Sequence, residues 1–286
     1  PYLSRGLGDV YKRQVDSRRL DLADFSEESE ADDAAAGAVV VPDGYALTLD
    51  VSADELVYDD LAFSGVSGQI DVREQTATMR RLAMRGLGGA LKVDGSYTAR
   101  SHGAPKLDLD VSLDQLDVSE LATRLDLSTR LAPLLAYARG ALSAELTLAG
   151  QLDETMSPVL TSIDSTGRLQ AKTLTLSGAP VLSSIADTLN SPALRDVSVG
   201  GVKLKYAFDA GRINIEPTAL KLGSLPATLS GSQGLDQSLD YMLTLEMPTE
   251  GAAGALKGLL DGLGDVALPE TVPVSLAVTG TVKQPK

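Results

Sequence analysis

The chain repeats a two-residue alternation of apolar and polar side chains. In the stretch GLDQSLDYMLTLEMP, residues 234–248, every second residue between positions 239 and 247 is apolar. These residues are Leu239, Tyr241, Leu243, Leu245 and Met247. Successive side chains of a β-strand point to opposite faces of a sheet, so this period predicts a strand with one apolar face.

The same period returns in five more segments. The alternating apolar residues are Tyr45, Leu47, Leu49 and Val51; Leu107, Leu109, Val111 and Leu113; Leu142, Ala144, Leu146 and Leu148; Val202, Leu204, Tyr206 and Phe208; and Val272, Val274, Leu276 and Val278. Glycine dipeptides between or beside these runs predict turns. They are Asp94-Gly95, Ala149-Gly150, Thr166-Gly167, Ala210-Gly211, Ser230-Gly231 and Thr279-Gly280. The pattern predicts a mainly β chain, folded as an extended antiparallel sheet with one apolar face.

A few segments have helical spacing instead. They are Val118–Leu125, Leu127–Ala138, Ala179–Asn190 and, weakened by its glycines, Ala253–Gly264. Ser119 is available as the cap of the first segment. Pro133 is expected to break the second. We therefore expect a few short amphipathic helices beside the sheet.

The first 38 residues do not share the alternation. Residues 1–14, PYLSRGLGDVYKRQ, resemble a translated sequencing-adapter junction, and we interpret them as a non-native segment of a metagenomic fragment. Residues 15–38 contain the acidic stretch DFSEESEADDAAAGA, which predicts a flexible linker or surface insertion. Residues 39–286 are expected to form the β domain.

Composition narrows the range of possible functions. A hydrophobic content of 43% allows a substantial core, and an aromatic content of 4% means that apolar surfaces are mostly aliphatic. The net charge of −14 argues against nucleic-acid binding and against a polybasic lipid-binding footprint. The chain has no cysteine, which excludes disulfides and thiolate nucleophiles.

Residues that could carry catalysis are sparse. His102 is the single histidine, and zinc sites need several histidine or cysteine ligands. The stretch RGLGGA, residues 85–90, lacks the Lys-Ser/Thr of a P-loop and predicts a hairpin or bulge instead. Carboxylates are abundant, so a glycosidase-like pair stays the enzymatic alternative. We expect no enzymatic activity, no cofactor and no metal.

A sheet with one apolar face needs another layer that shields this face from water. The chain could close on itself as a sandwich or barrel, or it could curl into a trough whose apolar face holds acyl chains. Smooth aliphatic walls favour the trough. A transmembrane barrel is disfavoured because three Phe, eight Tyr and no Trp make weak aromatic girdles.

One region resembles the C-terminal region of the AsmA family. In residues 146–190 the pattern is a strand ending in glycine, then "LD..M.P...S....G", a strand, "SG" and an amphipathic helix. The matching positions are Gly150, Leu152, Asp153, Met156, Pro158, Ser162, Gly167, Ser177 and Gly178, with the helix starting at Val181. Residues 206–248 match "..GR....P" and "SG..GLD..LDY", and the closing VTGTVKQPK is similar to the family's ending. The resemblance covers about residues 45–286.

The resemblance implies a non-enzymatic protein of the Gram-negative envelope. Such a protein is periplasmic and anchored to the inner membrane by an N-terminal segment that this sequence does not show. The implied function is phospholipid transport between the inner and outer membranes, or outer-membrane biogenesis, through a curled β-groove. The expected partners are phospholipid acyl chains and, further, envelope proteins.

On this hypothesis the groove wall consists of the alternating apolar residues. The candidates are Leu107, Leu109, Val111, Leu142, Leu146, Leu204, Tyr206, Phe208, Leu239, Tyr241, Leu243 and Leu245. Each could equally be an ordinary core residue. The alternative function is a structural or protein-interaction β module that assists outer-membrane protein assembly.

Overall fold

The structure is a computed structural model that describes residues 11–21, 46–58, 61–100, 103–124, 132–153, 157–249 and 269–286. Its strands are β1 (Tyr11–Asp21), β2 (Ala46–Tyr58), β3 (Leu61–Arg73), β4 (Thr76–Gly86), β5 (Gly89–Thr98), β6 (Lys106–Asp117), β7 (Ala138–Gln151), β8 (Asp164–Ser177), β9 (Asp196–Asp209), β10 (Arg212–Leu222), β11 (Leu225–Gly234), β12 (Ser238–Pro248) and β13 (Thr271–Thr281). The described helices are α1 (Val118–Arg124) and α3 (Pro180–Thr188), with 3₁₀ turns η2 (Pro133–Tyr137), η3 (Leu160–Ser162) and η4 (Pro192–Leu194).

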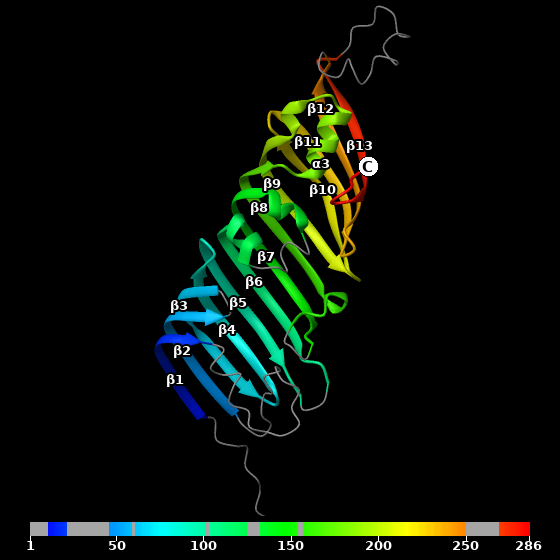
Figure 1. The fold of residues 1–286 in the computed structure, drawn as a ribbon. Coiled ribbons are helices and arrows are strands. Elements are labelled where there is room, and N and C mark those ends of the chain that lie inside the picture. Colours follow the sequence, from blue (N-terminus) through cyan, green and yellow to red (C-terminus); the bar gives the residue numbers. More distant parts are fainter. Residues whose placement is uncertain are drawn as a thin grey trace, which may run out of the picture. The chain divides into compact units, whose positions relative to one another are not determined.

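All thirteen strands belong to one hydrogen-bonded sheet, in the order of the sequence from β1 to β13 (Figure 1). Strands β2 to β6 and β10 to β13 pair antiparallel with their neighbours. Strand β1 pairs parallel with β2, which makes the sheet mixed. The predicted fold class, a mainly β chain with a curled, unclosed sheet and a few short helices, is confirmed.

The chain divides into two compact units. Unit 1 comprises Pro1–Leu116, Ala144–Gly167 and Asp209–Gly211, and unit 2 comprises Asp117–Ser143, Arg168–Phe208 and Arg212–Lys286. Each unit contains its own apolar sheet face.

In unit 1 the alternation places aliphatic side chains of five strands in register. One cross-strand row runs from Leu49 through Ile70 and Met79 to Gly95 and Leu109. The flanking rows are Leu47, Val72, Ala77, Tyr97 and Leu107 on one side, and Val51, Gly68, Leu82, Val93 and Val111 on the other. We call the side chains of these rows the unit 1 apolar face.

In unit 2 the equivalent face is packed under the protein's own helix. Helix α3 carries Leu182, Ile185 and Ala186 on one side, and all three are buried in a single core cluster with strand residues. The strand members include Leu243 of β12 and Val278 of β13. Figure 1 shows α3 lying over this part of the sheet. This part of unit 2 therefore has a closed core, whereas Leu204 and Tyr206 on β9 stay partly exposed.

Most of the predicted glycine turns are instead kinks within strands. Ala210-Gly211 is a turn between β9 and β10, as predicted. Asp94-Gly95, Ala149-Gly150, Thr166-Gly167, Ser230-Gly231 and Thr279-Gly280 all lie inside strands, so these five turn predictions are wrong. Glycine in a strand interior permits close backbone approach and local bending, which a curled sheet requires.

The helix predictions are confirmed in part. Helices α1 and α3 match two of the predicted segments. The cap of α1 is Asp117 rather than Ser119, because its Oδ1 accepts hydrogen bonds from the backbone N–H groups of Ser119 and Glu120 at 2.8 and 3.0 Å. Leu127–Ala138, predicted as a helix, contains the 3₁₀ turn η2 in its described part, and this turn begins at Pro133. Residues 253–264 lie outside the described residues.

The N-terminal region differs from the prediction. Strand β1 crosses the expected boundary at residue 14, and its register with β2 runs from Tyr11 opposite Leu47 to Asp21 opposite Val57. Residues 15–21, expected in a flexible linker, are therefore extended and paired. The physical reason is backbone hydrogen bonding along the edge of β2, which needs no alternation of side chains. The three predicted segments, 1–14, 15–38 and 39–286, otherwise stay predictions.

Candidate functional site

The unit 1 apolar face is the candidate site because its aliphatic side chains remain partly exposed. Leu107, Leu109, Val111 and Leu113 on β6 all keep some accessible surface. The same is true of the apolar face residues on β4 and β5, none of which is fully buried. In a sheet with a complete hydrophobic core, most such side chains would be inaccessible.

Among the described residues, unit 1 has few elements that could cover this face. Helices α1 and α3 both belong to unit 2, and the one helical element of unit 1 among the described residues is the three-residue turn η3. The described part of unit 1 therefore offers no α-helix to cover the face. Contact among neighbouring side chains in a row supplies the burial that they do have.

The structure divides the twelve predicted wall residues into two groups. Partly exposed are Leu107, Leu109, Val111, Leu146, Leu204, Tyr206 and Tyr241, and fully buried are Leu142, Phe208, Leu239, Leu243 and Leu245. Unit 1 contains Leu107, Leu109, Val111 and Leu146. The other eight belong to unit 2.

In unit 2 the predicted wall residues of β12 are core residues. Leu245 has no exposed surface, and Leu239 and Leu243 are 7% and 5% exposed. All three pack in the cluster that contains α3. The alternation of β12 resembles that of β6. The sequence pattern alone therefore did not reveal that a helix covers the apolar side of β12.

Sequence reasoning missed several residues of the face. Met79, Leu82 and Met84 on β4 and Leu91 and Val93 on β5 extend it beyond β6. The period on β4 is interrupted at Arg80 and Arg81, where the β4–β5 register shifts and Arg81 has a φ of +50°. A β-bulge adds one residue and so hides the two-residue period.

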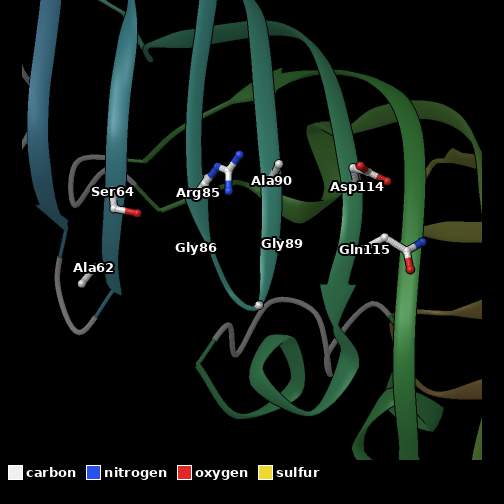
Figure 2. A pocket seen from close by; sticks show the side chains of 9 residues that line it. Ala62, Ser64, Arg85, Gly86, Gly89, Ala90, Asp114 and Gln115 are labelled. Carbon is white, nitrogen blue, oxygen red and sulfur yellow. The ribbon is translucent and has the colours of Figure 1, made fainter.

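A hollow of about 550 Å³ lies elsewhere on unit 1, at the turn between β4 and β5. Figure 2 shows Ser64 on β3, Arg85 on β4 and Asp114 on β6 around it. Arg85 follows Met84 and Asp114 follows Leu113 in the sequence, so these two side chains project from the opposite face of the sheet. Gly86 pairs with Gly89 across the turn, which confirms the predicted hairpin.

Burial perturbs two tyrosines on the apolar faces. Desolvation raises the pKa of Tyr97 in unit 1, and in unit 2 it raises the pKa of Tyr241 to about 12 despite the opposing charge of Arg212. Hydrogen bonds from Ser238 lower the pKa of Asp236. None of these shifts produces a group that titrates near neutral pH.

The predicted chemistry candidates give no assembled site within the described ranges. No cluster of three or more His, Asp or Glu residues suited to a metal ion occurs there. His102 lies outside the described residues. Among the helices that the structure describes, none combines the length and apolarity needed to cross a membrane.

Comparison of the chain with family models, with curated proteins and with solved structures finds no match. The resemblance to the AsmA family therefore stays a prediction, and the functional argument depends on the geometry of the apolar faces.

Proposed function

We propose that the protein is a non-enzymatic envelope protein that binds phospholipid acyl chains on the unit 1 apolar face. Its role is lipid transport between the inner and outer membranes, or outer-membrane biogenesis. This proposal takes the envelope setting, periplasmic with an inner-membrane anchor outside this sequence, from the AsmA resemblance. It takes the binding surface from the structure.

The observation that carries the proposal is the partial exposure of β4 to β6 on one face. Five strands at about 4.8 Å spacing span roughly 19 Å, and the three rows of the face cover roughly 14 Å along the strands. The face thus has a footprint of a few hundred Å² in which the apolar side chains are partly exposed, and extended exposed apolar patches usually have a binding partner.

The dimensions and chemistry suit an acyl chain. One leaflet of a bilayer's hydrocarbon core is about 15 Å thick, so a chain of that length fits within the face. The lining is Leu, Val, Ile and Met with a single tyrosine, Tyr97. Burial of the acyl chain's apolar surface stabilises the bound chain by about 25 cal/mol per Å². Because this lining provides few polar anchors, a bound chain can shift along the rows.

The polar face of the same strands suits contact with water. Asp108, Asp110 and Ser112 alternate with the apolar residues of β6 and are exposed. A lipid bound to the apolar face therefore leaves the outer face solvated. This two-sidedness is what the alternation encodes in unit 1.

A second function is favoured by unit 2. Part of its apolar face is closed by α3, as expected for a structural or protein-interaction module. If the unit 1 face were covered in the same way by another protein, the chain would be an assembly module for the outer membrane rather than a lipid carrier.

The test is detergent-free purification of the full chain from a Gram-negative host, followed by native mass spectrometry and lipid extraction. Val111→Asp places a charge on the apolar face, and Ser112→Asp places the same charge one residue away on the polar face. We expect phospholipid to co-purify with the wild type and with Ser112→Asp, and to be lost in folded Val111→Asp. A folded, lipid-free wild type would overturn the proposal in favour of the assembly module.

A further inference from the structure

A pair of glycines on β9 creates an opening in the polar face of unit 2. Gly200 and Gly201 interrupt the alternation between Val199 and Val202. Gly201 has a φ of +67°, and a Cβ atom there would meet nothing within 4 Å. The result is a short strip of β9 backbone without side chains.

Lysines from both neighbouring strands flank this strip. A Cβ atom built on Gly200 would lie 4.0 Å from Cβ of Lys221 on β10 and 3.9 Å from the carbonyl oxygen of Lys172 on β8. Strands β8, β9 and β10 are consecutive in the sheet. The two lysines therefore stand on either side of the glycine pair, about 10 Å apart at the backbone.

A third lysine follows on β9 itself. Lys203 lies between Val202 and Leu204, which are half-buried on the apolar face, so its side chain projects from the polar face. Lys172, Lys203 and Lys221 are all exposed. We call these three residues the lysine cluster.

The lysine cluster lacks carboxylate partners in the part of the chain that the structure describes. The ion pair nearest in sequence joins Lys205 to Glu216 at 3.8 Å and does not include any of the three. The chain as a whole carries a net charge of −14. The remaining charge is spread over the molecule, and at physiological salt its effect falls off beyond a Debye length of about 8 Å. An anion at the strip would therefore respond mainly to the nearby lysines.

We propose that the lysine cluster binds a phosphate-bearing anion over the Gly200–Gly201 strip. Lysine ammonium groups attract phosphate as point charges from several directions, and the missing side chains leave space for the anion between them. The phosphate could belong to an anionic lipid headgroup or to a small soluble molecule. The site lies on the polar face of unit 2, so it goes beyond the acyl-chain binding proposed for unit 1 and does not depend on it.

The experiment uses the full chain and two matched triple variants. The test variant is Lys172→Ser, Lys203→Ser and Lys221→Ser. The control is Lys92→Ser, Lys106→Ser and Lys283→Ser, which removes the same charge from exposed positions elsewhere. Binding is measured by co-sedimentation with phosphatidylcholine vesicles that contain or lack phosphatidylglycerol, and by calorimetry with inorganic phosphate. Circular dichroism confirms that each variant is folded.

For a headgroup site, the wild type and the control bind the anionic vesicles, and the test variant binds them roughly 100-fold more weakly. For a site specific to small anions, inorganic phosphate binds to the wild type and control, not to the test variant, and vesicles do not sediment the protein. The proposal is overturned if neither probe binds, or if both triple variants weaken binding equally. Phospholipid co-purification through unit 1 should be the same in all three proteins, which separates this test from that of the proposed function.

Discussion

A Cβ atom on Gly95 of β5 would lie 2.1 Å from the carbonyl oxygen of Asp108 on β6. The same relationship occurs in unit 2, where a Cβ atom on Gly231 of β11 would lie 2.1 Å from the carbonyl oxygen of Asp240 on β12. Both glycines have a positive φ, +144° and +127°. Each unit thus uses a glycine within a strand to bring two backbones closer than any side chain would allow.

Substitution Gly95→Ala should therefore destabilise the protein strongly. The added methyl group meets backbone atoms, which cannot rotate away, and the φ value is one that alanine rarely adopts. We expect a loss of more than about 3 kcal/mol in the free energy of unfolding, since overpacking and backbone strain each cost about 1–3 kcal/mol. Urea denaturation followed by circular dichroism measures it.

The control for this prediction is Gly65→Ala. Gly65 has a φ of +60°, and a Cβ atom there would meet nothing within 4 Å. This variant should be destabilised only by the penalty for a left-handed conformation, which is about 1–2 kcal/mol. Equal losses for the two variants would show that the close approach of β5 and β6 does not matter.

The two apolar faces should respond differently to truncation. Leu245 in unit 2 is fully buried, so Leu245→Ala should cost about 2–5 kcal/mol. Leu109 in unit 1 is partly exposed, and Leu109→Ala should cost less than about 1.5 kcal/mol because part of its surface already faces solvent. Denaturation of both variants without lipid gives the comparison. A larger loss at Leu109 would mean that its face is a closed core.

Tyr241 should lose its hydroxyl proton at a higher pH than an ordinary tyrosine. Its pKa of about 12 lies above the ordinary value of 10.0, because burial penalises the phenolate. The folded state therefore holds this proton more tightly than the unfolded state. Its stabilising contribution is complete below pH 10 and is lost as the pH rises toward 12.

The measurement is the ultraviolet absorbance of tyrosinate during alkaline titration of the wild type and of Tyr241→Phe. The difference between the two curves should have its midpoint near pH 12 while the fold persists. A midpoint near 10 would mean that the hydroxyl group of Tyr241 is solvated.

Asp117 should stabilise the start of α1. Its carboxylate accepts the N–H groups of Ser119 and Glu120, so Asp117→Ala should cost about 1 kcal/mol. Ser119→Ala should cost far less, because Ser119 enters this cap through its backbone N–H. Thermal unfolding of the two variants measures both losses. A larger loss for Ser119→Ala than for Asp117→Ala would show that Ser119 is the cap.

The two-residue period predicted six of the thirteen described strands, β2, β6, β7, β9, β12 and β13, because that period depends only on local geometry. Residues such as Leu107 to Leu113 alternate without interruption, and β6 forms where they lie. The period was harder to follow across bulges, as at Arg80 and Arg81, where one extra residue shifts the phase. Glycines were misassigned because glycine is common in turns, whereas Gly95 and Gly231 lie within strands and bring neighbouring strands together.

The candidate site was harder to predict than the fold. Leu109 and Leu243 have the same local pattern, yet Leu243 is buried with α3 and Leu109 is partly exposed. Which strands a helix covers depends on long-range packing rather than on any strand's own residues. The lysine cluster was hidden in the same way, since Lys172 and Lys221 are distant in sequence and lie on either side of the glycine pair only in the folded sheet.

The central claim is that acyl chains contact the unit 1 apolar face, and site-specific photocrosslinking tests it most directly. A photoreactive amino acid is placed at Leu109 in one variant and at Asp110 in another, and detergent-free protein from Gram-negative cells is irradiated and analysed by mass spectrometry. The account predicts phospholipid adducts at position 109 and none at position 110, because adjacent residues of β6 point to opposite faces. Adducts at both positions, or none at position 109 in a folded protein, would contradict it.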